Sequence, residues 1–72
     1  MTRLQINMED GMPSHLQNWG EWHGMMGQRW DTVKSKFTET TNGVMVGTKG
    51  EKRFEIVFEN DEDALAFILR WA

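Results

Sequence analysis

Large apolar and mostly charged side chains alternate over residues 53–59, which places Phe54, Ile56 and Phe58 on one side. Successive side chains of a β-strand point to opposite faces of the sheet, so this segment is predicted to be a strand with one buried face. Its other side carries two glutamates and a valine. That composition indicates an antiparallel sheet that is covered on one face only.

A helix is predicted directly after this strand, over residues 61–72. The side-chain oxygen of Asn60 is well suited to accept a hydrogen bond from a backbone N–H group at the start of a helix. Asp61, Glu62 and Asp63 fill the first turn, where the helix dipole favours negative charge. A catalytic role for this acidic run is the alternative interpretation, and the dipole-matched helix start is the preferred one.

The predicted C-terminal helix carries two apolar stripes. Leu65, Ile68, Leu69 and Ala72 form one stripe, and Ala64, Phe67 and Trp71 form the second. We expect the first stripe to cover the sheet, and the second to contact another helix or a partner. The predicted core therefore contains Leu4, Ile6, Phe54, Ile56, Phe58, Leu65, Ile68 and Leu69.

The N-terminal half is predicted to contain a strand and a helix. Residues 2–8 alternate between apolar and polar side chains, and residues 9–11 have the composition of a turn. Pro13 suits a helix entrance and Ser14 suits a cap, so a helix is predicted from Ser14 to Gly24. Its glycines weaken this prediction, because each costs about 1 kcal/mol relative to alanine within a helix.

Two more strands are predicted before the Phe54 strand. Residues 29–37 place Val33, Ser35 and Phe37 on one face, and Asn42-Gly43 is a strong hairpin signal. Residues 44–46 continue as a strand, and residues 47–50 form the next turn. The element order is therefore β-α-β-β-β-α. This order predicts an α+β two-layer sandwich, related to the ferredoxin-like fold, with an antiparallel sheet and two helices on one face.

Size and composition predict a single domain over residues 1–72 that depends on a partner. A chain of 72 residues buries only a modest core, and the absence of cysteine excludes disulfides and thiolate zinc sites. We therefore expect a homo-oligomer or a protein partner. The aromatic residues expected at the interface are Phe67, Trp71, Trp19 and Trp22.

Catalytic and metal-binding functions find little support in the sequence. His15 and His23 are eight residues apart, so on one helix they lie about 12 Å apart along the axis and cannot bind one metal ion together. Neither serine is accompanied by the base that an activated nucleophile requires. We therefore predict a protein that is not an enzyme, with no catalytic residues, no cofactor and no metal.

Basic residues suggest an alternative function. Lys34 and Lys36 share one face of a predicted strand, and three more basic residues follow near the next turn. Such a patch on a sheet is one way to bind nucleic acid, although paired surface charges are the simpler interpretation. The net charge of −3 also argues against a general nucleic-acid binder. The residues of this patch are Lys34, Lys36, Lys49, Lys52 and Arg53.

The C-terminal strand and helix resemble a known group of proteins. The segment is similar to the C-terminus of small uncharacterised proteins from contractile-tailed phages of marine bacteria. The resemblance implies a phage protein without an assigned activity. The matching residues are Phe54, Phe58, Glu62, Asp63, Ala64, Phe67, Leu69, Arg70 and Trp71.

Taken together, these patterns favour a small interaction module that binds a protein partner. No apolar run approaches the ~20 residues that a membrane-spanning helix needs. A cytoplasmic protein is expected, in the host cell if the source is a phage.

Overall fold

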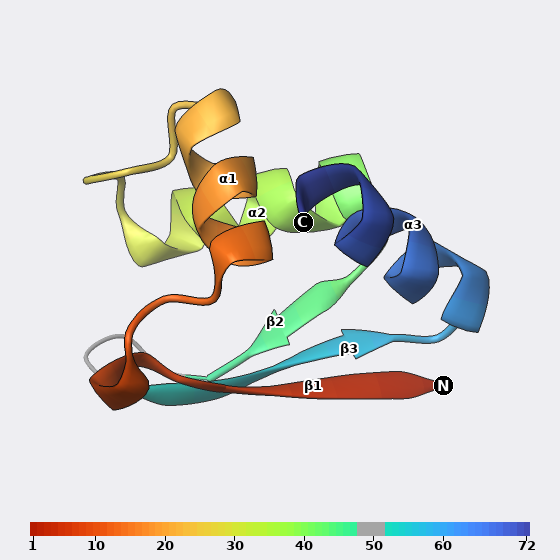
Figure 1. Ribbon diagram of the computed structural model, residues 1–72. Coiled ribbons are helices and arrows are strands. Elements are labelled where there is room, and N and C mark those ends of the chain that lie inside the picture. Colours follow the sequence, from red (N-terminus) through yellow and green to blue (C-terminus); the bar gives the residue numbers. More distant parts are fainter. Residues whose placement is uncertain (48–51) are drawn as a thin grey trace.

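The computed structural model describes residues 1–47 and 52–72 (Figure 1). It contains three strands, three α-helices and one turn of 3₁₀-helix. In chain order these are β1 (Thr2–Asn7), the 3₁₀ turn η1 (Met8–Asp10), α1 (Ser14–Trp22), α2 (Trp30–Thr41), β2 (Val44–Val46), β3 (Arg53–Phe58) and α3 (Asp61–Trp71).

The three strands form one antiparallel sheet in the order β1-β3-β2. β3 is central, and its Ile56 lies between Leu4 of β1 and Met45 of β2. All three helices lie on the same side of this sheet, and among the described residues no helix lies on its other side (Figure 1). The predicted α+β class, with an antiparallel sheet covered by helices on one face, is therefore confirmed.

The strand predicted over residues 29–37 is wrong, because Arg29 is the N-cap of α2 and residues 30–37 belong to that helix. The alternation of Val33, Ser35 and Phe37 coincides with a helical spacing in which Trp30, Val33 and Phe37 share one side. Phe37 is fully buried, and Trp30 and Val33 are partly buried against the core. The element order is thus β-α-α-β-β-α, and the relation to the ferredoxin-like fold stays a prediction.

The hairpin predicted at Asn42-Gly43 is also wrong, because these residues end α2. Asn42 has a left-handed backbone with a φ of 64°, and its N–H donates to the carbonyl of Thr38. The same positive φ that suits a hairpin turn also suits a helix C-terminus. Gly43 then passes so close to Phe37 and Phe58 that a Cβ atom there would lie 2.7 Å from each ring.

α1 begins and ends close to the predicted positions. Pro13 occupies the N-cap position, and no side chain caps the helix, so the predicted capping role of Ser14 is wrong. The helix ends at Trp22, two residues earlier than predicted. Gly24 has a φ of 68° in the turn that follows, which is a conformation that glycine adopts without strain.

The predicted sequence of strand, cap and helix at the C-terminus is confirmed. Asn60 is in an extended conformation, and its side-chain oxygen accepts a hydrogen bond of 2.9 Å from the N–H of Glu62. The three acidic residues occupy the first turn of α3 as expected. The predicted turn over residues 47–50 lies largely outside the described residues.

The side of α3 that faces the sheet differs from the prediction. Phe67 is only 3% exposed, whereas Leu65 is 58% and Leu69 is 71% exposed. Ala64 is also buried, and Ile68 and Trp71 are partly buried against the core. The stripe that was assigned to a partner is therefore the one that contacts the core.

Four buried aromatic rings explain this choice. The ring centroids of Phe37 lie 5.0 Å from Trp19, 6.1 Å from Phe58 and 5.2 Å from Phe67, which connects all three helices to β3. The indole N–H of Trp19 donates to Thr40 Oγ1 at 3.0 Å. Leucine in place of Phe67 would lose the edge-on ring contacts, which favour aromatic pairs beyond the area they bury.

This core predicts that two alanine substitutions lower the free energy of unfolding by very different amounts. Ile56 is fully buried at the centre of the sheet, so we expect Ile56→Ala to lower the free energy of unfolding by about 2–5 kcal/mol. Leu65→Ala is expected to cost less than about 1 kcal/mol, because Leu65 leaves no comparable cavity. Urea denaturation followed by tryptophan fluorescence measures both. A loss of several kcal/mol for Leu65→Ala would contradict the observed orientation of α3.

Candidate interaction surfaces

The aromatic residues predicted for an interface divide into buried and exposed ones. Trp19 and Phe67 are buried within the chain, so their side chains are not accessible to a partner in the folded protein. Trp71 is partly buried, and its ring lies 6.2 Å from that of Trp22 on α1. Trp22 remains 72% exposed. The first helix thus covers the stripe that was expected to contact a second copy of the chain.

The outer face of α3 is the more prominent apolar surface. We use this name for the exposed residues that point away from the core: Glu62, Leu65, Ala66, Leu69 and Arg70. Leu65 and Leu69 lie one turn apart and stand next to each other on the helix. α3 lies at one side of the helical layer (Figure 1), and no other described helix packs on this face. The sequence pattern contained this stripe but did not show which of the two stripes faces the sheet.

Charges on the outer face are arranged in a definite order. Glu62 lies one turn before Ala66 and Arg70 one turn after it. In the described part of the chain the ion pairs join Arg3 to Glu55 and the N-terminus to Asp61, and neither involves Glu62 or Arg70. Arg70 instead lies over the ring of Trp71, with its guanidinium carbon 4.9 Å from the ring centre.

A second apolar surface lies on the face of the sheet without helices. Val44 and Val46 of β2 are each about half exposed, and Met1 is largely exposed. Val57 of β3 is the cross-strand partner of Val44, so these side chains share one face of the sheet. This surface was not predicted from the sequence. The apolar strand Val44–Val46 was the sequence pattern that could have indicated it. Met45 points to the buried face, and the valines on either side of it point to the open face, where they are about half exposed.

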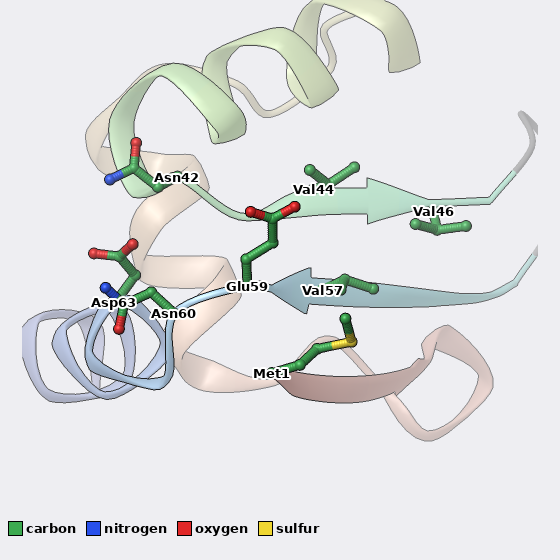
Figure 2. A pocket seen from close by; sticks show the side chains of 8 residues that line it. All are labelled: Met1, Asn42, Val44, Val46, Val57, Glu59, Asn60 and Asp63. Carbon is green, nitrogen blue, oxygen red and sulfur yellow. The ribbon is translucent and has the colours of Figure 1, made fainter.

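These side chains line a groove of about 490 Å³ (Figure 2). Its apolar part consists of Met1, Val44, Val46 and Val57. Its polar end lies where α2 ends and α3 begins. The residues at that end are Asn42, Glu59, Asn60 and Asp63.

The basic residues predicted to form one patch do not share a strand face. Lys34 and Lys36 are both on α2, two positions apart, and point to different sides of that helix. Arg53 is the first residue of β3, and Lys52 directly precedes it. Lys49 falls outside the described residues. The prediction that Lys34 and Lys36 share one face of a sheet is therefore wrong.

The two histidines are separate, and the surroundings of each lower its pKa. His15 lies edge-on to Phe67 at 5.4 Å, and its Nε2 atom is buried without a hydrogen-bond partner in the described part of the chain. Burial lowers the pKa of His15. Burial, and then the nearby charges of Lys36 and Arg70, lower the pKa of His23, although Glu39 opposes this effect. Among the described residues, no three potential ligands are close enough to hold a metal ion.

Comparisons with protein-family models, with curated proteins and with solved structures found no match to this chain. The resemblance to phage proteins therefore stays an expectation from the sequence. No helix in the described part of the chain has the length and hydrophobicity needed to cross a bilayer.

Because the pKa of each histidine is lowered in the folded chain, we expect the fold to lose stability in mild acid. An unfolded chain binds a proton at each histidine near the ordinary pKa of about 6.5, whereas the folded chain binds it only at lower pH. Stability should therefore be full above pH 7 and fall as the pH drops through 6.5. The pKa of Asp61 is lowered by the Thr2 hydroxyl and the N-terminus, but its effect begins only at more acidic pH.

Thermal unfolding of wild type and His15→Gln at pH 7.5 and pH 5.0 measures this effect. We expect the melting temperature of the wild type to drop more between the two pH values than that of the variant. Equal drops in melting temperature would show that the packing of His15 between α1 and α3 does not lower its pKa.

Proposed function

We propose that the protein is a non-enzymatic interaction module that associates with a second copy of itself through the outer face of α3. The observation that carries this proposal is the exposure of Leu65 and Leu69, side by side on a helix whose other side already fills the core. Burying a leucine completely stabilises an assembly by about 1.5–3 kcal/mol. The self-association surface was predicted to contain Phe67. The proposed surface instead contains Leu65 and Leu69, on the opposite side of α3.

A second copy is favoured because the outer face is complementary to itself. In an antiparallel pair of α3 helices whose two-fold axis passes near Ala66, Glu62 of each copy faces Arg70 of the other. Each charge lies four residues, or about 6 Å, from the axis. The small side chain of Ala66 permits helices to approach at the 8–10 Å typical of close packing. A two-fold interface uses the same patch on both copies, and this patch satisfies that condition.

The size of this face predicts a dimer of modest affinity. One helix from each copy buries less than the ~1,200–2,000 Å² of a standard stable interface. We therefore expect dissociation at micromolar concentration rather than an obligate assembly. Each copy keeps its own aromatic core, so the monomer should remain folded.

Two wider parts of the interpretation rest on the sequence alone. A role as a phage accessory protein rests on the resemblance of the C-terminal segment. Nucleic-acid binding stays the alternative, and the separation of Lys34 and Lys36 on α2 weakens it. A change in the gel mobility of short DNA or RNA on adding the protein, which disappears when salt is added, would favour that alternative, because phosphate contacts release counterions.

Leu69→Glu is expected to make the protein monomeric without unfolding it. The side chain is exposed, so the charge is tolerated in the monomer, whereas a dimer would bury two carboxylates beside leucines. Sedimentation equilibrium from 5 to 500 µM measures the mass, and circular dichroism checks the fold. Thr38→Glu, at an exposed position of α2, is the matched control and should associate like wild type.

Exchange of the two charges tests the antiparallel arrangement. Arg70→Glu alone should weaken association because it places two carboxylates opposite each other. The double variant Glu62→Arg with Arg70→Glu should recover it, since the pair is restored in the opposite sense. A wild type that sediments as a single chain at all concentrations would overturn self-association. A double variant no better than Arg70→Glu would overturn the antiparallel geometry.

A further inference from the structure

We propose that the groove on the open face of the sheet binds an extended segment of a partner protein in which a basic side chain is followed by apolar ones at alternate positions. The groove is the surface lined by Met1, Asn42, Val44, Val46, Val57, Glu59, Asn60 and Asp63 (Figure 2). It lies on β2 and β3, not on the outer face of α3. This inference therefore goes beyond self-association, and it can hold or fail independently of it.

The apolar floor favours an extended peptide. Val44 and Val46 are two residues apart on β2, so their side chains are about 7 Å apart on one face. An extended segment that lies along this face repeats its own side chains at the same spacing. Its alternate apolar residues would thus contact the two valines in turn, with Val57 beside the first of them.

The polar end favours a basic side chain. Glu59 and Asp63 place two carboxylates at the end of the groove that is nearest to Val44 and Val57. The ion pairs in the described part of the chain involve other carboxylates, those of Glu55 and Asp61. Asn42, which also lines this end, is the C-cap of α2, and a helix C-terminus carries partial negative charge.

Nearby positive charge is already engaged. Arg3, the cross-strand neighbour of Val57 on β1, pairs with Glu55 at 3.6 Å. Gln5 also donates to Glu55. Glu55 is therefore compensated, and Glu59 and Asp63 set the charge at the polar end. The partial positive charge at the N-terminus of α3 offsets this negative charge only weakly. The Asn60 side chain and the acidic residues of the first turn already compensate that partial charge.

The combination fixes the chemistry of the ligand and the end of the groove at which its charge lies. A lysine or arginine at the end beside Glu59 and Asp63 accounts for the carboxylates, and apolar residues two and four positions further account for the valines. A volume of about 490 Å³ lies within the ~300–1,000 Å³ of ordinary ligand pockets and accommodates a few side chains.

The test uses two synthetic peptides and the full chain labelled with nitrogen-15. The probe is acetyl-Arg-Thr-Val-Thr-Val-amide, and its control carries glutamate in place of arginine. We expect the arginine peptide to shift the backbone amide signals of Val44, Val46, Val57 and Glu59 in a saturable manner. The affinity should fall as salt is added, because the charged end is exposed to solvent. The glutamate peptide should bind at least about tenfold more weakly.

Matched variants locate the charged contact. The double variant Glu59→Gln with Asp63→Asn should reduce affinity for the arginine peptide about tenfold, as expected for the loss of two exposed ion pairs. Its control, Glu62→Gln with Asp31→Asn, removes the same number of carboxylates, both from helix first turns, and leaves the groove unchanged, so binding should persist.

Three results would overturn the inference: no binding of the arginine peptide, equal binding of both peptides, or signal changes confined to α3 residues such as Leu65 and Leu69. The monomeric variant Leu69→Glu separates the two proposals. It should retain peptide binding, whereas the double variant at Glu59 and Asp63 should retain self-association.

Discussion

The contact that the rest of the structure depends on is the packing of Phe37 against three other rings. Its side chain is fully buried, and it lies within 5.0–6.1 Å, centroid to centroid, of Trp19, Phe58 and Phe67. These four residues come from the three helices and the central strand, so one ring joins every layer of the fold. A small domain without disulfides has few such contacts available, and large aromatic side chains supply much buried area for each residue that is ordered.

The same packing determines which surfaces remain for partners. Because Phe67 turns toward Phe37, the opposite side of α3 presents Leu65 and Leu69 to solvent. Because all three helices lie on the side of the sheet that contains Phe58, Val44 and Val46 on the other side remain about half exposed. The proposed interaction surfaces are thus the two places where no other element of the described residues packs, which is where exposed apolar side chains most often mark a binding site.

The sequence predicted the three observed strands, the cap at Asn60 and the α+β class, because each depends on local patterns with one physical interpretation. It failed where a pattern fits two structures. Trp30, Val33 and Phe37 fit a helix and, in part, a strand, and Asn42 suits either a hairpin or the end of a helix. The two stripes of α3 differ little in hydrophobicity, so only the shape of the core, with small Ala64 beside Phe67, decides between them. The valines of β2 were a signal of the open face, but the groove could not be predicted as a whole, because Met1 and residues 57–63 join β2 from distant parts of the chain.

A dimer formed through the outer face of α3 would carry two grooves in a fixed relative position. Neither surface uses residues of the other, since Leu65 and Leu69 belong to the helical layer and Val44, Val46 and Val57 to the open face of the sheet. A partner with two copies of a basic and apolar segment would therefore engage both grooves at once, and the second contact would form at the high effective concentration of a linked pair. The dimer contact is limited by the short helix α3, and each groove by the three-residue strand β2. Binding through both grooves at once would nevertheless be much tighter than binding through one. This would be the physical advantage of the proposed self-association for so small a chain.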